Sequence, residues 1–254
     1  MIKEIEISIP QSYEDITLRK YLELQRELKN YEDDVEAQSA VLVTYLCGID
    51  SKDLSGLGRA DYVNISADIS SWIGNTNYPL QQLIWIDGVE YGLEPNLSNM
   101  SYGAYADITQ YDTITIDDNW AKIMSILYRP VTKKVRDTYE IERYTGSVDY
   151  NKFLDVTMDK HFGTLFFFCT FVNGLSEKYP ELYEGGGDQS QHQVNFGKKW
   201  RNYTTIMALS GEDISKIDSV VEEPLEKCLL YLAYKADKIQ LEDMMHKESL
   251  RKMA

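Results

Sequence analysis

The hydrophobic residues of this chain recur mostly at intervals of three and four positions, the spacing of one face of a helix. In the segment after Asp159 apolar residues lie on nearly every side, which is typical of a helix buried from several directions. Thr17 and Gly48 have the residue types of an N-cap and a C-terminal stop. The pattern predicts helices at about 18–28, 35–47, 61–73, 100–108, 119–128, 159–175, 196–209 and 224–239.

Three stretches alternate apolar and polar residues instead, which is typical of half-buried strands. They are Ile2–Ile9, residues 83–93 and Thr138–Tyr144. The second contains Asp87-Gly88, a pair that supplies the positive φ angles of a tight hairpin turn. We therefore expect an α+β fold, mainly α-helical, with a small antiparallel sheet built from the N-terminal strand and the Asp-Gly hairpin.

One low-complexity segment follows Tyr183 and contains Gly185-Gly186-Gly187, a composition typical of linkers and loops. We take it as the boundary between a helical domain with the small sheet, residues 1–184, and a C-terminal helical segment, residues 185–254, that packs on it. The last helix turns polar after Ile239. Residues beyond about His246 are expected to fray or to wait for a partner.

Charge narrows the class of partner. The 41 acidic and 26 basic residues give a net charge of −15, which argues against binding to nucleic acid through phosphate contacts. An acidic decoy of nucleic acid would gather its carboxylates on one face, whereas here they alternate with Lys and Arg. Tyr is frequent, with 19 residues, and suits both protein interfaces and the edge of a core.

The three cysteines are far apart in apolar stretches, which favours buried free thiols in a reducing compartment over disulfides or a zinc site. The longest apolar run, Phe162–Val172, is too short to span a bilayer, and the N-terminus lacks the apolar core of a signal peptide. We expect a protein that is made and kept in a cytoplasm, without membrane contact.

No catalytic constellation is evident. The histidines His161, His192 and His246 lack metal-ligand spacing, and the glycine run has neither the preceding strand nor the GK[ST] of a phosphate loop. We therefore expect no enzyme, no cofactor and no metal. An acidic hydrolase with a carboxylate site assembled by the fold stays open as an alternative of another class. The paired carboxylates that could contribute are Asp33-Asp34, Asp117-Asp118, Glu222-Glu223 and Glu242-Asp243.

Three groups of residues together resemble a known family. The first is the Ile9-Pro10 end of the opening strand with Ile16-Thr17-Leu18 and Tyr21-Leu22. The second runs from Asp87-Gly88 to Leu127-Tyr128-Arg129-Pro130-Val131, and the third comprises Trp200, Ala208-Leu209, Asp213-Ile214 and Leu232-Ala233-Tyr234. This layout resembles the tail-assembly-chaperone-like proteins of tailed bacteriophages, including crAss-like phages. The resemblance touches most of the chain and carries over no catalytic residue.

The resemblance implies a non-enzymatic viral assembly or structural protein that binds tape-measure, tail or neck proteins in the host cytoplasm. A packaged or connector component of the mature virion is the alternative, and a homo-oligomer stays open. Aromatic residues at helix edges are the candidate contacts with a partner, and a groove between the N-terminal helices is one candidate surface. These residues are Tyr21, Tyr45, Trp72, Trp200 and Tyr234.

Overall fold

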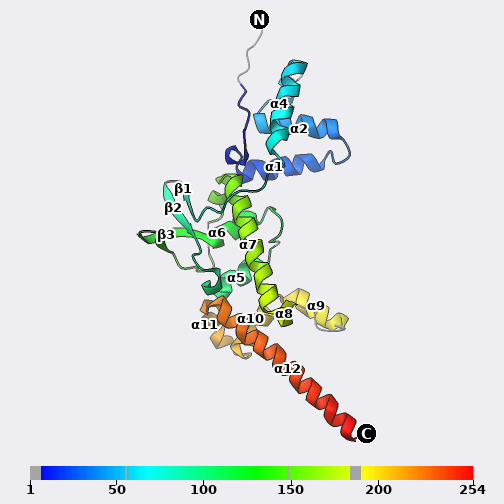
Figure 1. The fold of residues 1–254 in the computed structure, drawn as a ribbon, viewed down its shortest axis with the longest axis vertical. Helices are drawn as coiled ribbons and strands as arrows, with labels where there is room; N and C mark the ends of the chain where they lie inside the picture. The colour runs from blue at the N-terminus through cyan, green and yellow to red at the C-terminus, as the bar shows by residue number, and fades with distance from the viewer. Residues whose placement is uncertain (1–6, 55, 112, 148, 184–189, 254) are drawn as a thin grey trace. The chain divides into compact units, whose positions relative to one another are not determined.

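The computed structural model describes residues 7–54, 56–111, 113–147, 149–183 and 190–253 (Figure 1). It is 63% helical with a small four-stranded antiparallel sheet, which confirms the predicted fold class. The chain divides into two compact units. Unit 1 comprises residues 1–91, 115–125 and 149–167, and unit 2 comprises residues 92–114, 126–148 and 168–254.

Unit 1 is built mainly from short helices near the N-terminus. Its elements are η1 (Tyr13–Asp15), α1 (Leu18–Lys29), α2 (Val35–Cys47), α3 (Ser51–Leu54), α4 (Arg59–Trp72), β1 (Leu83–Ile86) and η3 (Asn151–Asp155), with the first parts of β2 (Val89–Leu93), α6 (Trp120–Leu127) and α7 (Met158–Lys178).

Helix α1 begins and helix α2 ends at the capping residues predicted from the sequence. The Thr17 side chain accepts a hydrogen bond from the Lys20 amide, and Asp34 does the same for Ala37 at the start of α2. Gly48 ends α2 with a φ of 66°, a conformation that costs glycine less than any other residue. Local sequence is therefore sufficient to fix these two helices.

We expect Thr17→Ala to lower the free energy of unfolding by about 1 kcal/mol, since the amide of Lys20 loses its acceptor at the helix start. Thr17→Ser keeps a hydroxyl there and should stay within a few tenths of a kcal/mol of the wild type. Urea unfolding followed by circular dichroism measures both. Equal losses for the two variants would contradict the capping role.

The start of α7 is held against the start of α1. The Leu18 amide donates to the Val156 carbonyl at 2.9 Å, and the Met158 amide donates to the Ile16 carbonyl at 2.7 Å. Further along α7, a Cβ added at Gly163 would lie 2.6 Å from the Pro79 carbonyl oxygen. Glycine at this position therefore allows the helix and the segment before β1 to approach closely.

Tyr13 lies at the centre of the aromatic core of unit 1. Its ring packs edge-on against Phe162 and Trp72, with centroid distances of 4.8 and 5.2 Å, and against Tyr21 and Tyr78. The hydroxyl of Tyr13 donates to the Ile73 carbonyl at 2.8 Å, and burial raises the pKa of this phenol to about 12. The abundant Tyr is thus used in part inside the core, with its hydroxyl satisfied.

The predicted hairpin is confirmed. Strands β1 and β2 are joined by Asp87 and Gly88, whose φ angles of 50° and 77° are those of the expected turn. The sheet continues in the order β1-β2-β3-β4. The predicted N-terminal strand is wrong in its described part, because Ile7–Ile9 pairs with no strand; residues 1–6 lie outside the described residues.

Unit 2 contains the rest of the sheet and the C-terminal helices. Its elements are the last residues of β2, α6 and α7 with η2 (Leu97–Asn99), α5 (Tyr102–Thr109), β3 (Tyr128–Val135), β4 (Thr138–Ile141), α8 (Pro180–Tyr183), α9 (Gln191–Trp200), α10 (Asn202–Ser210), η4 (Ile214–Lys216), α11 (Ile217–Glu222) and α12 (Leu225–Met253).

The first turn of α5 is hydrogen-bonded to the segment that precedes α12, and the first turn of α12 is hydrogen-bonded to the segment that precedes α5. The Tyr102 amide donates to the Glu223 carbonyl at 2.8 Å, and the Leu225 amide donates to the Met100 carbonyl at 2.9 Å. Each bond satisfies an amide that its own helix cannot. The C-terminal helices thus belong to the same unit as residues 92–114, and the expected boundary at residue 184 does not coincide with the division of the structure. The glycine-rich segment, residues 184–189, lies outside the described residues.

Two further expectations need correction. The single helix expected at 196–209 is two helices, α9 and α10, because Arg201 takes a φ of 41° between them. The helix α7 is not buried on all sides, because Phe166 is 74% exposed while Phe168 is fully buried.

Candidate functional site

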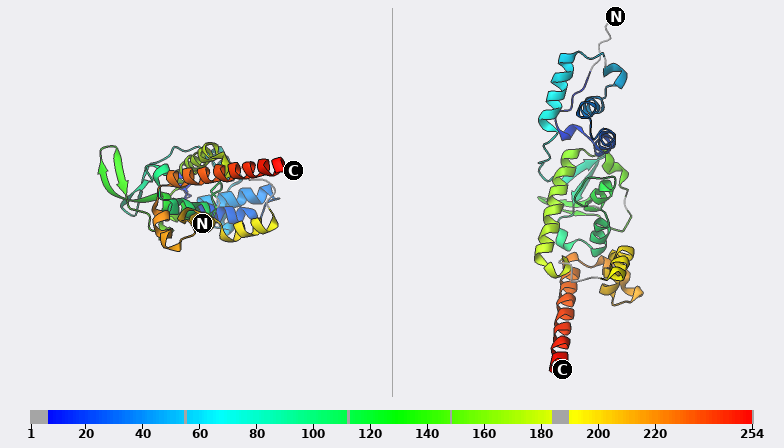
Figure 2. Two further views of the ribbon diagram at one scale, coloured as in Figure 1. Left: turned by 90° about the horizontal axis from the view of Figure 1, so that it is seen from below. Right: turned by 90° about the vertical axis from the view of Figure 1, so that its right-hand side faces the viewer.

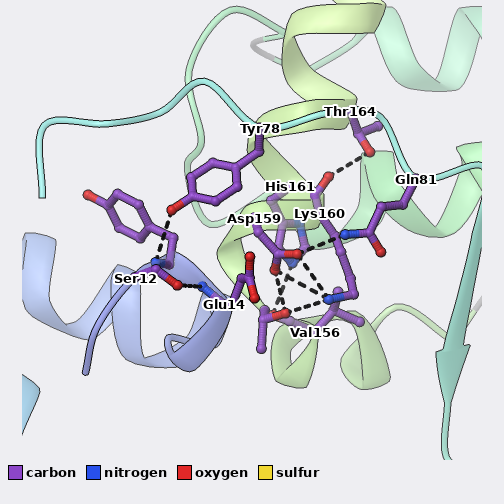
Figure 3. Close-up of polar contacts among 11 residues, drawn as sticks. Ser12, Glu14, Tyr78, Gln81, Val156, Asp159, Lys160, His161 and Thr164 are labelled. Carbon is purple, nitrogen blue, oxygen red and sulfur yellow. Dashed lines mark hydrogen bonds and ion pairs between the residues drawn. The ribbon is translucent and has the colours of Figure 1, made fainter. Parts of the chain in front are cut away.

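A polar cluster lies where α7 begins, in unit 1 (Figure 3). The Asp159 carboxylate is buried and accepts hydrogen bonds from the Thr157 hydroxyl at 2.6 Å and the Gln81 amide at 2.9 Å. Lys160 lies beside it, with Nζ 3.2 Å from Oδ2 of Asp159. These partners hold the charge of Asp159 at the N-terminal end of a helix, where a carboxylate is stabilised. The cluster therefore anchors the start of α7.

His161 follows in the same cluster and is fully buried. Its Nε2 lies 3.2 Å from the Val156 carbonyl, and burial lowers the pKa of the imidazole to about 4. The ring is therefore neutral at physiological pH, so that Nε2 can donate to that carbonyl. This histidine is a structural residue in the core, without access to a substrate.

Unit 2 contains an open cavity of about 820 Å³. The buried pair Arg129–Glu94 lies on its wall, with the two side chains 8% and 15% exposed. The Tyr144 hydroxyl donates to Asp107 Oδ2 at 2.6 Å, and burial with this bond raises the pKa of the phenol. Two of the carboxylates on the wall are thus engaged by a guanidinium and a phenol.

The rest of this lining is also acidic. Glu140, Glu142, Asp218 and Glu222 contribute carboxylates, and Arg143 is the other basic residue, with a guanidinium nitrogen 3.7 Å from Glu222. Such a wall favours cationic groups over anionic ones. Its lining contains no histidine or cysteine, and its one serine, Ser101, uses its side chain to accept a hydrogen bond from the Ala104 amide at the start of α5.

The cysteine thiols are the next candidate nucleophiles, and the His, Cys, Asp and Glu side chains are the candidate metal ligands. Burial raises the pKa of the Cys228 thiol to about 11 and also raises that of Cys47, which makes both poor nucleophiles at neutral pH. None of the three cysteines forms a disulfide. Within the part of the chain that the structure describes, no group of three or more His, Cys, Asp or Glu side chains is placed to hold a metal ion.

Two of the residues predicted to contact a partner lie in the aromatic core of unit 1 instead. Trp72 is 9% exposed and packs against Tyr13, and Tyr21 packs on the rings of Tyr13 and Phe162. Their rings pack within the unit, and Trp72 in particular is almost fully buried. Tyr45 is half-buried beside a shallow depression at the end of α2.

Trp200 lies at the surface of unit 2 among other aromatic rings. It is 41% exposed, between Phe196 at a centroid distance of 6.4 Å and Tyr203 at 5.6 Å, and Lys199 Nζ lies 4.9 Å from its ring. We call Phe196, Trp200 and Tyr203 the aromatic patch. Exposed Trp and Tyr of this kind are enriched at protein interfaces.

Tyr234, the last predicted contact residue, is 61% exposed on α12. From Asp237 to Lys252 every residue of this helix is exposed, and in Figure 1 and the right-hand view of Figure 2 this half runs beyond the other elements of unit 2. We call residues 237–252 the distal half of α12. Its large apolar side chains are each more than half exposed, namely Ile239, Leu241, Met244, Met245 and Leu250.

Sequence reasoning missed the acidic cavity and the breadth of the apolar surface on the distal half. The sequence did carry a signal for this apolar surface, because Ile239, Leu241 and Met244-Met245 are interspersed with polar and charged residues. The cavity had no such signal, because its carboxylates come from separate segments of the chain.

A scan against models of protein families gave no match to this chain, and searches of curated proteins and of solved structures also gave none. Among the described residues no helix has the length and apolar character needed to cross a membrane.

Proposed function

We propose that this protein is a non-enzymatic bacteriophage assembly protein that binds other tail or virion proteins, in the manner of a tail assembly chaperone. The observation that carries the proposal is the distal half of α12, a helix whose five large apolar side chains are each more than half exposed among the described residues. An isolated helix of this length is marginally stable in water, so a function that covers it with a partner is favoured. The aromatic patch on α9 and α10 supports the same role.

One face of the distal half is the candidate docking surface. Leu225 and Leu229 are buried and Ala236 is half-buried, and Ile239 and Leu250 continue the same helical spacing into the exposed distal half. A partner that presents an apolar groove would extend the packing of α12 by the helix-in-groove mode. Tape-measure, tail and neck proteins are the proposed partners, met in the host cytoplasm during assembly.

We expect the full chain to co-purify with a tape-measure, tail or neck protein when the two are co-expressed from the same genome. The variant Ile239→Asp with Leu250→Asp should lose the complex, because two charges would replace apolar contacts. A control with Gln240→Asp and Ser249→Asp adds the same charge beside the face and should keep it. Failure of every tail and neck protein to co-purify, or equal loss in both double variants, would contradict the proposal.

Retention in the finished particle distinguishes the two forms of the proposal. Mass spectrometry of purified virions finds the chain if it is a packaged or connector component, and finds it absent if it acts only during assembly.

A further inference from the structure

A second face of α12 carries a regular seam that the other elements of unit 2 leave uncovered. Its six residues are spaced alternately by four and three positions, the repeat of a coiled coil. Every one of the six is exposed, and the three large side chains Tyr234, Leu241 and Met245 are 61%, 53% and 62% exposed. The seam consists of Tyr234, Lys238, Leu241, Met245, Glu248 and Lys252.

We propose that two copies of this chain pair along this seam, with their α12 helices antiparallel. The order of residue types along the seam is the reason. Antiparallel helices centred between Leu241 and Met245 place Leu241 of each copy opposite Met245 of the other. These two layers form an apolar centre in which four exposed side chains become buried together.

The flanking layers are complementary in charge. With the centre fixed, Lys238 of each copy lies opposite Glu248 of the other, so the dimer gains two equivalent ion pairs. One layer further out, Tyr234 lies opposite Lys252 of the second copy, a combination suited to a cation–π contact. All six residues of the seam thus find a suitable opposite, and each contact occurs twice, as in a self-complementary interface.

The parallel arrangement of the same helices is disfavoured by charge. In register it would set Lys238 against Lys238, Glu248 against Glu248 and Lys252 against Lys252. Like charges held this close destabilise a helix pair. Charge therefore selects the antiparallel orientation.

Lys238 makes a weak ion pair within its own helix, so its side chain can reorient toward a second copy. Its Nζ lies 3.8 Å from Glu242 Oε1, and the two side chains are 55% and 64% exposed. An exposed ion pair at this separation contributes little to stability. This pairing rests on the seam alone and stands or falls separately from the proposed assembly role, whose face contains Ile239 and Leu250.

The test is the mass of the full chain by sedimentation equilibrium over a range of concentrations. We expect a reversible dimer. Lys238→Glu or Glu248→Lys alone sets like charges against each other twice and should weaken the dimer by about tenfold or more. The two changes together restore opposite charges and should return most of the affinity. Lys247→Glu, off the seam on the same helix, is the matched control and should dimerise as the wild type does.

Orientation is measured by pulsed electron paramagnetic resonance on the full chain with a spin label at Arg251→Cys. In the antiparallel register residue 251 lies opposite residue 235, so the two labels are displaced by about 24 Å along the helix axis, from 16 residues at 1.5 Å each. In a parallel dimer that displacement is zero. The wild type carried through the same labelling gives the background from Cys169, which is partly accessible.

A chain that stays monomeric at all concentrations overturns the proposal. A dimer whose two labels show no displacement along the helix axis also overturns it. So does a double variant, with Lys238→Glu and Glu248→Lys, that fails to recover the affinity of the dimer. Each variant changes an exposed residue, and its circular dichroism verifies that the fold is retained.

Discussion

Replacing Arg129 by Met is expected to lower the free energy of unfolding by about 3–5 kcal/mol, the usual cost of removing one partner from a buried ion pair. The Arg129 side chain is 8% exposed and donates through a guanidinium nitrogen to Glu94, whose side chain is only 15% exposed. The substitution leaves the mostly buried Glu94 carboxylate without the guanidinium that pairs with it. Urea unfolding of the full chain at pH 7 measures the loss.

The double variant Glu94→Met with Arg129→Met is the informative control. It removes both charges and places apolar side chains where the pair was, a change that is often neutral in other proteins. We expect its stability to lie much nearer the wild type than that of Arg129→Met. If the double variant lost as much as the two single variants added together, the coupling between the two side chains would be absent and the assignment of a tight buried pair would be wrong.

Local signals were sufficient for much of the fold. Thr17 fixes the start of α1, and Gly48 fixes the end of α2. Asp87-Gly88 fixes the β1–β2 hairpin. In each case the residue that determines the backbone lies at the cap or turn itself. Such features depend on neighbours in the sequence and need no tertiary contact.

Strand β3 shows where local reasoning ends. Four of its residues, from Thr132 to Val135, are exposed, so it lacks the alternation that marks a half-buried strand. Its pairing with β4 places Val135 opposite Thr138 and Lys133 opposite Glu140, and Arg136 between the strands takes a φ of 54° that is unusual for its residue type. Strand β3 is stabilised by its pairing with β4, and the sequence of a single segment does not reveal such a pairing.

The break between α9 and α10 has a similar cause. The Arg201 guanidinium donates to the Gln110 backbone carbonyl at 3.3 Å, and the side-chain amide of Asn202 donates to the Ala106 backbone carbonyl at 2.5 Å. Both acceptors lie at or near the end of α5, about 90 residues earlier in the chain. A continuous helix, which the sequence alone favours, would forgo these bonds.

The candidate site was predictable only in part, because an aromatic residue at a helix edge looks the same in sequence whether it faces the core or water. Trp72 and Tyr21 pack on Tyr13, whereas Trp200 and Tyr234 are exposed. What separates them is the presence of covering segments, which only the fold determines. For α12, the polar composition after Ile239 correctly marked where the core ends, but the expected fraying beyond His246 is wrong, because the helix continues to Met253.

Lowering the pH is expected to destabilise this protein through His161, in a window set by its two pKa values. Burial holds the pKa of the folded imidazole at about 4, against 6.5 for the ordinary side chain. Between these values the unfolded chain binds a proton that the folded chain does not, so the contribution of neutral His161 is complete above pH 6.5 and is lost as the pH falls toward 4. At about 1.4 kcal/mol per pH unit, the loss reaches about 2 kcal/mol at pH 5.

The comparison that isolates this effect is His161→Gln, whose side-chain amide can still donate to the Val156 carbonyl. Its stability at pH 7 should fall because the side chain fits the core differently, but the drop between pH 7 and pH 5 should be smaller than that of the wild type by about 2 kcal/mol. His246→Gln changes an exposed residue and should leave the wild-type slope unaltered. Parallel pH profiles for the wild type and His161→Gln would show that the folded imidazole binds its proton at an ordinary pH, which burial on all sides forbids.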